Sequence, residues 1–571
     1  MDTIVQTRWN SWLSRQLEDA DLAEELQAMK GNEKKIEDCF YRELEFGTGG
    51  LRGVIGVGTN RMNIYTVAKA TQGYADYLNE NFQSPTVAIA YDSRIKSDRF
   101  AEVAAEVLAA NGIRVYMYPE LMPTPALSFA VRSLGCSGGI VITASHNPAK
   151  YNGYKVYGAD GCQITTEAAK AILTKINAVD VFRDVKRISF ARGTEQNIIS
   201  YIGEETVEAF IQAVSAQALC GDENIDKSLS IVYTPLNGTG LKCVTRCLKE
   251  NGFTNISVVK EQAEPDGNFP TCPYPNPEIR EALEVGLKEA RRLGSELLLA
   301  TDPDCDRVGI AIKSENDYVL LSGNEVGMLL LDYICKRRLA LKRMPENPIV
   351  IKTIVTIDMA KRIAAGYGVQ VVDVLTGFKF IGEQIGLLER KREADRFILG
   401  FEESYGYLTG SYVRDKDAVN ASLLICEMFA YYKARGKSLL NVLNGLYTKY
   451  GYCLNTLHSY EFEGASGFRK MQNIMEKLRN ECPKTWIGHK IVSVSDYQKS
   501  VTRYRDGRVV KIDLPVSNVL KFELEDNISV VVRPSGTEPK LKMYISVSAG
   551  SREEAGDLEK RFVKVLEMLL A

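Results

Sequence analysis

Residues 296–307 read ELLLATDPDCDR, a short apolar run that turns directly into a polar loop with three aspartates. An apolar run of this length without alternation is typical of a β-strand that is buried on both faces. We expect five further segments of the same kind to form strands followed by polar loops. They are VAIAYDSR (87–94), GIVITASHNP (139–148), SIVYTPLNGTG (230–240), IVIKTIVT (349–356) and FILGFEES (397–404).

Helical patterns lie between these strands, for example at 99–112, 279–294 and 421–436, and each of the three ends in glycine, a common helix stop. Strand–helix alternation predicts α/β domains whose sheets are covered on both faces. In such sheets, ligands gather beyond the carboxyl ends of the strands, where the polar loops begin. The last third instead predicts several strands and a closing helix, which indicates a separate α+β domain.

The chain has 571 residues, which suggests about four domains. We place them at 1–205, 206–322, 323–450 and 451–571. With 71 basic and 73 acidic residues the net charge is −2, so nothing in the composition favours nucleic acid or an anionic membrane. No apolar stretch is long enough to span a membrane, and the N-terminus lacks the apolar core of a signal peptide. Twelve cysteines without a CxxC pair predict reduced thiols and a cytoplasmic protein.

The aspartates of DPDCDR indicate a metal site. Asp302, Asp304 and Asp306 repel one another unless a cation lies among them, and oxygen ligands suit Mg²⁺ or Ca²⁺. The EF-hand spacing is absent. A solvated acidic turn is the alternative, but the apolar runs on both sides place the three aspartates at the edge of a core.

The segment GIVITASHNP ends in a loop that presents Ser145. Pro148 biases the residue before it away from helical geometry, so the loop has a defined shape. The Ser145 hydroxyl could attack phosphorus or carry a phosphoryl group, and Lys155 could supply charge or a proton. A helix-capping or turn serine is the alternative. Just upstream, residues 135–139 match the hydrolase pattern G-x-S-x-G, but a strand follows this motif where a hydrolase has a helix.

Two further loops carry groups for binding a phosphorylated sugar. SVVVRPSGTEPKLKMY (529–544) offers a guanidinium, two hydroxyls, an ammonium and a flexible glycine, which suit phosphate. FILGFEES ends in carboxylates and a hydroxyl, which suit sugar hydroxyls. Plain alternatives are a polar hairpin for the first loop and a helix N-terminus for the second.

Together, and in this order, these motifs resemble the α-D-phosphohexomutase family, from about residue 40 to the C-terminus. TASHNP is similar to the family's phosphoserine loop, and DPDCDR to its metal loop, usually D-G-D-x-D-R, with Pro303 in place of the glycine. Pro303 leaves a long, phosphopentomutase-like subgroup open. The other matches are FGTGGLRG with Arg52, LTGFKFIG with Thr376, FEES with Glu402 and Ser404, and RPSGTEP with Arg533, Ser535, Gly536 and Thr537.

The resemblance implies three related α/β domains with mixed sheets and a smaller C-terminal α+β domain around one central cleft. It also implies a phosphoglucomutase reaction, in which glucose 1-phosphate and glucose 6-phosphate interconvert through phosphorylated Ser145 and glucose 1,6-bisphosphate. The three aspartates and Ser145 would bind Mg²⁺. The sugar and phosphate loops would hold the substrate, and Lys416 would contact phosphate or relay protons.

The proton acceptor implied by the resemblance is Lys155, with His146 as the competing base. A lysine needs a lowered pKa for this role, and we expect desolvation near Arg307 to provide it.

Several alternatives stay open at this point. Within the family they are phosphomannomutase, phosphopentomutase and glucose-1,6-bisphosphate synthase activities. Outside it, a metal-dependent sugar phosphatase would use a similar aspartate cluster, and a sugar-phosphate-binding regulator would not need Ser145. The expected partners are small sugar phosphates, with neither nucleic acid nor membrane. The oligomeric state is not determined by the sequence, and a monomer is compatible with it.

Overall fold

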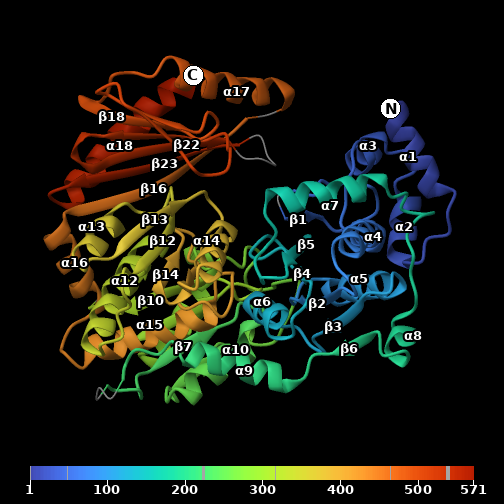
Figure 1. Ribbon diagram of the computed structural model, residues 1–571, viewed down its shortest axis with the longest axis horizontal. Coiled ribbons are helices and arrows are strands. Elements are labelled where there is room, and N and C mark those ends of the chain that lie inside the picture. Colours follow the sequence, from blue (N-terminus) through green and yellow to red (C-terminus); the bar gives the residue numbers. More distant parts are fainter. Residues whose placement is uncertain are drawn as a thin grey trace. The chain divides into compact units, whose positions relative to one another are not determined.

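The chain divides into two compact units that do not follow its order. Unit 1 consists of Met1–Leu321, Ile381–Asp395 and Tyr405–Tyr431, and unit 2 of Ser322–Phe380, Arg396–Ser404 and Tyr432–Ala571. Figure 1 traces both in a computed structural model. It describes residues 2–47, 49–221, 225–315, 317–462, 464–534 and 540–570.

The first sheet of unit 1 is six-stranded and mixed, in the order β1-β5-β4-β2-β3-β6. β4, β2, β3 and β6 run parallel, whereas β5 pairs antiparallel with both β4 and β1. The predicted strands at 87–94 and 139–148 are its central strands β2 and β4. The strands are β1 (Gly50–Val54), β2 (Thr86–Tyr91), β3 (Arg114–Met117), β4 (Gly138–Ile142), β5 (Tyr151–Gly158) and β6 (Ile199–Tyr201).

The helices of this domain build its core together with the sheet. Buried residues of α4 and α5 pack in one cluster with those of β2 and β4. The N-terminal helices join the same cluster, because Trp12 stacks edge-on against Phe40 and Tyr65. The helices are α1 (Thr3–Leu13), α2 (Ala20–Ala28), α3 (Glu33–Phe40), α4 (Ile64–Asn81), α5 (Ser97–Ala110), α6 (Thr124–Ser133), α7 (Thr166–Ala178) and α8 (Phe190–Glu195).

The second sheet of unit 1 has the order β11-β10-β9-β7-β8. β9, β7 and β8 are parallel, and β10 and β11 continue the sheet in antiparallel fashion. Its strands are β7 (Ile231–Thr234), β8 (Ile256–Val258), β9 (Leu297–Thr301), β10 (Val308–Lys313) and β11 (Tyr318–Leu321). The helices here are α9 (Glu204–Ser215), α10 (Gly240–Glu250), η1 (Lys260–Gln262) and α11 (Arg280–Leu293).

Unit 2 contains parallel pairs of β12 with β13 and with β14. The strands are β12 (Ile349–Thr353), β13 (Gln370–Val374) and β14 (Phe397–Phe401), and β15 (Tyr407–Leu408) follows in the chain. The helices of unit 2 are α12 (Gly323–Ala340), α13 (Met359–Ala365) and α16 (Leu439–Tyr450). Most of α14 (Phe378–Arg390) and of α15 (Ala418–Lys433), together with β15, belongs to unit 1, and η2 (Ala394–Arg396) spans a change of unit along the chain.

The C-terminal sheet is antiparallel, in the order β16-β23-β22-β21-β18-β19-β20, with β17 beside β18. Helices α17 and α18 contribute to its core through buried residues such as Met475 and Phe562. The elements are β16 (Tyr452–Glu461), α17 (Gly464–Asn480), β17 (Thr485–Trp486), β18 (His489–Asp496), β19 (Val501–Tyr504), β20 (Val509–Lys511), β21 (Leu520–Leu524), η3 (Glu525–Asn527), β22 (Ile528–Pro534), β23 (Lys540–Ala549) and α18 (Arg552–Leu570).

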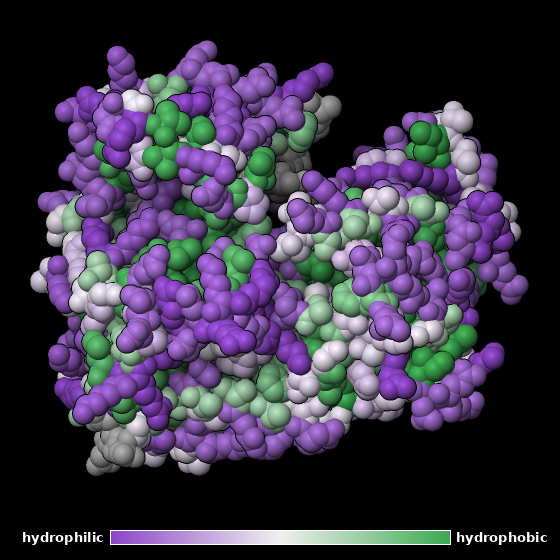
Figure 2. Space-filling model, in the orientation of Figure 1, coloured by the Kyte–Doolittle hydropathy of each residue, from purple (hydrophilic) through white to green (hydrophobic). Residues whose placement is uncertain are grey.

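Three α/β sheets followed by a C-terminal α+β region confirm the predicted fold class. The domain boundaries at 205/206, 322/323 and 450/451 stay predictions. Within the described residues, no helix is both long enough and apolar enough to cross a membrane. The face drawn in Figure 2 is largely hydrophilic, with hydrophobic residues in separate patches.

Candidate active site

Ser145 lies in the loop that follows β4, and the loop holds its hydroxyl in place. The residue has a left-handed backbone with φ 51°, unusual for a residue with a side chain. Its N–H donates to Thr143 Oγ1 over 2.7 Å. Its Oγ donates to Asp302 Oδ2 over 2.7 Å and lies 3.2 Å from His146 Nδ1. Ser145 is only 4% exposed, so its surroundings are shielded from bulk water.

A buried arginine that sequence reasoning missed fixes the shape of this loop. The Arg94 guanidinium follows β2 and donates to the carbonyl oxygens of four residues, Ser145, Asn147, Pro148 and Tyr151. Asp92 lies beside it, with Oδ2 3.4 Å from Arg94 Nε. The sequence places Asp92 and Arg94 directly after a buried strand, at the sheet edge where ligands gather. This position could have indicated that they belong to the site.

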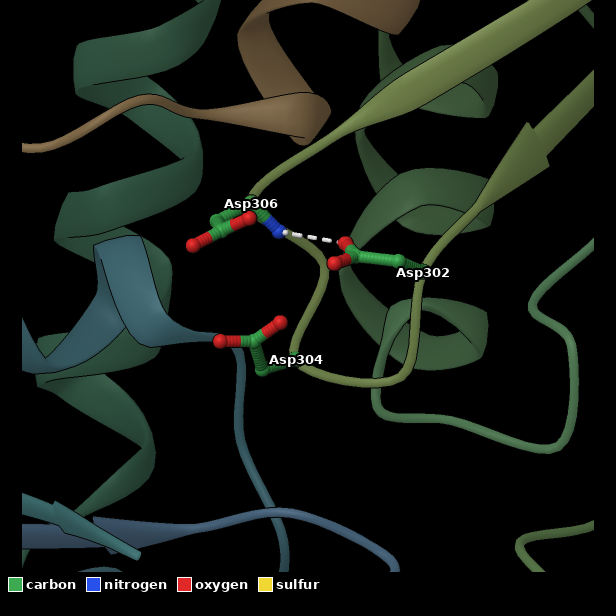
Figure 3. Close-up of side chains that lie close together, drawn as sticks. All are labelled: Asp302, Asp304 and Asp306. Carbon is green, nitrogen blue, oxygen red and sulfur yellow. Dashed lines mark hydrogen bonds between the residues drawn. The ribbon is translucent and has the colours of Figure 1, made fainter. Parts of the chain in front are cut away.

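The three aspartates lie on the tight turn between β9 and β10 (Figure 3). Asp302 Oδ1 accepts the backbone N–H groups of Asp306 and Arg307, over 3.1 and 3.0 Å, which closes the turn. Each aspartate provides one oxygen within 4.8 Å of the others, and all three residues are buried. The predicted cluster is therefore present.

The donor set fits a hard metal ion. Among the described residues, Asp304 Oδ1 and Asp306 Oδ1 are buried without a hydrogen-bond partner. Burial, and then the charges of Asp304 and Asp306, raise the pKa of Asp302 well above its usual value. A cation among the carboxylates would relieve both penalties, and oxygen donors suit Mg²⁺.

Two lysines contact this cluster from different parts of unit 1. Lys155 Nζ, on β5, lies 2.8 Å from Asp304 Oδ2 and 3.6 Å from Asp306 Oδ2. Lys416 Nζ lies 2.9 Å from Asp306 Oδ2 and 3.3 Å from Asp415 Oδ1. The carboxylates of the cluster are thus partly neutralised by neighbouring ammonium groups.

The expected low pKa of Lys155 is wrong for this arrangement. Burial acts to lower the pKa of Lys155, but Asp304 and Asp306 outweigh it and raise the pKa above its usual value. The prediction considered desolvation near Arg307 and neglected ion pairs with the metal loop. Arg307 Nη1 donates to Glu278 Oε1 over 2.7 Å, and its Nε lies 3.7 Å from Asp306 Oδ1.

His146 and Arg52 complete the surroundings of Ser145. Burial, and then the charges of Arg307 and Arg52, lower the pKa of His146 well below its usual value. The neutral form of the imidazole is therefore favoured, and the same surroundings make it a weak proton acceptor. Arg52 is exposed, and its Nη1 lies 3.4 Å from Asn147 Oδ1.

In unit 2, the two loops predicted to contact sugar lie together. Glu402 is buried and its Oε1 accepts the N–H of Gly377 over 3.1 Å, which joins the loop after β14 to the loop before α14. Thr376 Oγ1 is buried and lacks a hydrogen-bond partner within the part of the chain that the structure describes. Ser404 is partly exposed at the end of the same loop. Glu403 instead accepts hydrogen bonds from Thr353 and Thr356.

Arg533 is the penultimate residue of β22 in the same unit. Burial, and then the carboxylate of Glu403, raise the pKa of Tyr544, while Arg533 opposes this rise, so these three side chains lie near one another. The predicted phosphate-loop residues Ser535, Gly536 and Thr537 lie outside the described residues.

Neither the G-x-S-x-G motif nor the cysteines are assigned a catalytic role. Ser137, in the G-x-S-x-G motif, accepts the N–H of Thr86 through Oγ and lies just before β4, so the motif is a turn into a strand. All twelve cysteines are free, and Cys243 and Cys247 are both buried on α10.

The comparisons with known proteins agree with this architecture. Models of the phosphoglucomutase/phosphomannomutase family match its α/β/α domains I, II and III at residues 43–182, 208–315 and 322–450, and its C-terminal domain at 490–565. A phosphoglucomutase of Staphylococcus haemolyticus (strain JCSC1435) is 37% identical over 91% of this chain and 93% of its own length.

Two solved structures share the fold. A phosphoglucomutase/phosphomannomutase family protein from Burkholderia thailandensis aligns with TM-score 0.66 and 20% identity, over 92% of this chain and 97% of that one. Parafusin, a phosphoglucomutase from Paramecium solved in its open form, aligns with TM-score 0.67 and 18% identity, over 93% and 94%.

Fold and site together define a phosphohexomutase, an enzyme of the isomerase class. The chain belongs to the phosphoglucomutase/phosphomannomutase family, as the sequence motifs predicted.

Proposed function

We propose that this protein is a phosphoglucomutase that interconverts glucose 1-phosphate and glucose 6-phosphate through phosphorylated Ser145. The observation that carries the proposal is the 2.7 Å hydrogen bond from Ser145 Oγ to Asp302, one of three buried aspartates. A nucleophilic hydroxyl beside a metal-binding cluster is what phosphoryl transfer requires. The sequence identity to a phosphoglucomutase supports glucose as the sugar.

The residues suited to hold Mg²⁺ are Asp302, Asp304 and Asp306, joined by Ser145 or its phosphate. When bound, Mg²⁺ would neutralise phosphate charge and polarise phosphorus. Lys155 and Lys416, which already pair with this cluster, would add positive charge next to the transferred group. Arg307 and Arg52 would contribute to the same positive field.

For the substrate we propose two sets of contacts in unit 2. Glu402, Ser404 and Thr376 would bind the sugar hydroxyls. Arg533, together with Ser535, Gly536 and Thr537, would bind the phosphate that the sugar already carries. A guanidinium fork with neighbouring hydroxyls suits a phosphate monoester.

The transfer balances without a further co-reactant. The bond between Ser145 Oγ and phosphorus breaks, and a bond from the free sugar hydroxyl to phosphorus forms. The proton of that hydroxyl passes to a base, for which His146 and Lys155 are the candidates. The resulting glucose 1,6-bisphosphate returns its other phosphoryl group to Ser145, so that the phosphate has moved between C1 and C6.

The test is a parallel assay of the purified protein with Mg²⁺, a trace of glucose 1,6-bisphosphate and one sugar 1-phosphate, followed by phosphorus NMR. Glucose, mannose and ribose 1-phosphates are compared. We expect glucose 1-phosphate to become glucose 6-phosphate fastest. Faster conversion of mannose or ribose 1-phosphate would instead favour a phosphomannomutase or phosphopentomutase. Inorganic phosphate as the only product would replace the proposal with a phosphatase. A cytoplasmic location stays a prediction.

A further inference from the structure

A second cavity of about 630 Å³ lies in unit 1, where loops after β2 and β3 meet the start of α10. Its inner wall includes Asp92, Ser93, Arg94 and Thr239, and its rim includes Glu120 and Lys242. This volume is typical of a pocket for a small ligand. None of the residues assigned above to metal, sugar or phosphate binding lines it.

Two side-chain hydroxyls of the inner wall lack a hydrogen-bond partner. Within the described residues, Ser93 Oγ and Thr239 Oγ1 are buried without one, whereas Asp92 Oδ2 and Arg94 Nε lie 3.4 Å apart and form an ion pair. Thr239 is only 2% exposed. Buried polar groups are nearly always satisfied in native proteins, so these two hydroxyls in one cavity wall point to a missing ligand or its ordered water.

The start of α10 gives the cavity a site for an anion. Thr239 is the N-cap residue, and its side chain makes no cap hydrogen bond to the first turn. The first N–H groups of a helix have no partner within the helix and can donate to an anion. The preceding segment TPLNGTG joins a buried strand to this helix, a pattern shared by phosphate-binding loops. Lys242, in the first turn, places an ammonium group at the rim, where it pairs with Glu120 over 2.7 Å and with Glu204 over 2.8 Å.

The carboxylates of the cavity could bind the hydroxyl groups of a ligand whose phosphate lies at the helix N-terminus. Glu120 is largely exposed and already pairs with Lys242 over 2.7 Å, so water screens its charge. Asp92 lies beside Arg94. Carboxylates can accept hydrogen bonds from the hydroxyls of a sugar.

The cavity also adjoins residues that hold the Ser145 loop and the metal loop in place. Arg94 donates to the carbonyl of Ser145. Thr239 N–H donates to Pro303 O in the metal loop over 2.8 Å. An occupant would therefore contact residues that position both loops.

We infer that this cavity is a second binding site, for the phosphate monoester of a sugar, separate from the catalytic centre. The phosphate would bind at the N-terminus of α10, to Thr239 and Lys242. The sugar would contact Asp92, Ser93 and Arg94. The inference rests on the proposed function only for the identity of the phosphosugar used as a probe.

Calorimetric titration with glucose 6-phosphate, on metal-free protein so that no turnover occurs, tests the site. We expect two equivalents bound by the wild type and one by Thr239→Val or Lys242→Gln. Lys249→Gln, at the far end of the same helix and outside the cavity, is the matched control and should retain two. Thermal unfolding of all three variants checks the fold.

The variant Arg533→Gln isolates the second site, since it weakens the phosphate contact proposed for catalysis. Arg533→Gln should still bind one equivalent of glucose 6-phosphate, and adding Lys242→Gln to this variant should abolish that binding. This expectation does not depend on whether the protein is a mutase. A parallel titration with inorganic phosphate distinguishes a phosphate site from a phosphosugar site, and equally tight binding of phosphate would overturn the sugar assignment. One equivalent in the wild type, or unchanged binding in both cavity variants, would overturn the site itself.

Discussion

At the scale of single residues, the account depends on how Ser145 is held. Its left-handed backbone and its hydrogen bond to Asp302 orient the hydroxyl toward the metal loop. The serine and the aspartates could be predicted from the sequence, since their chemistry is local to two motifs. Arg94 could not be assigned in the same way, because its role depends on carbonyl groups more than fifty residues away in the chain.

Replacing Ser145 by alanine should reduce mutase turnover by at least about three orders of magnitude, because the phosphoryl carrier is lost. The free energy of unfolding should change little. Ser137→Ala, in the turn before β4, is the control, and it should lose about 1 kcal/mol of stability at most and keep its activity. Phosphorus NMR and thermal unfolding provide both readouts. Comparable turnover in Ser145→Ala would refute the mechanism.

Arg94→Lys should lower kcat about a hundredfold, since one ammonium cannot replace a guanidinium that donates to four carbonyls. The KM for the sugar phosphate should change less than threefold, because Arg94 is not among the contacts proposed for the substrate at the catalytic centre. Steady-state kinetics separate the two parameters. An equal effect on KM and kcat would show that Arg94 does not act by positioning the serine loop.

At the scale of elements, the buried strands could be predicted from the sequence, but the strands that pair with them at the sheet edges could not. The apolar runs at 87–94, 139–148, 230–240, 296–307, 349–356 and 397–404 correspond to β2, β4, β7, β9, β12 and β14. The antiparallel strands β1, β5, β10 and β11 extend the sheets through pairings that no local pattern specifies. The loop after β7 also supports the metal loop, a contact that only the folded chain reveals.

Gly238→Ala should disturb the metal loop, because a Cβ at Gly238 would lie 2.4 Å from Pro303 Cα. We expect at least a tenfold lower kcat, by displacement of the aspartates, and a higher Mg²⁺ concentration for half-maximal activity. Gly445→Ala on α16 meets no neighbouring atoms and should instead gain up to about 1 kcal/mol of stability. Mg²⁺ titrations of activity measure the first effect. An unchanged Mg²⁺ requirement would mean that this loop does not support the site.

A buried charge network in unit 2 should make stability depend on pH. Asp358 lies 3.1 Å from Lys352, 3.1 Å from Lys361 and 3.2 Å from Lys521. Burial alone would raise the pKa of Asp358, but these lysines hold it well below its usual value. A lowered folded pKa gives stability that is present above about pH 4, the unfolded pKa of aspartate, and is lost as the pH falls toward the folded pKa.

Asp358→Asn should therefore cost about 3 kcal/mol at pH 7 and less at pH 3. Urea unfolding at both pH values measures this difference. Ser529→Ala removes a weaker, uncharged contact of Asp358 and serves as the control, with little pH dependence expected. A cost of Asp358→Asn that is equal at both pH values would contradict the assigned charge interaction.

At the scale of the whole molecule, the compact units draw on segments far apart in the chain. Residues 405–431 belong to unit 1 although their neighbours in sequence belong to unit 2. This explains why Lys416, predicted to contact phosphate or relay protons, pairs with Asp306 of the metal loop. Such long-range pairing could not be predicted from a motif, whereas the family itself could, because six motifs occur in a fixed order.

The central claim is that Ser145 carries the phosphoryl group, and mass spectrometry of the peptide containing Ser145 tests it most directly. The protein is incubated with glucose 1,6-bisphosphate, freed of ligand, and then given glucose 1-phosphate. The account predicts that the peptide gains one phosphoryl group in the first step and, once glucose 1-phosphate is added, loses it to the sugar. A peptide that is never phosphorylated while glucose 1-phosphate still becomes glucose 6-phosphate would contradict the account.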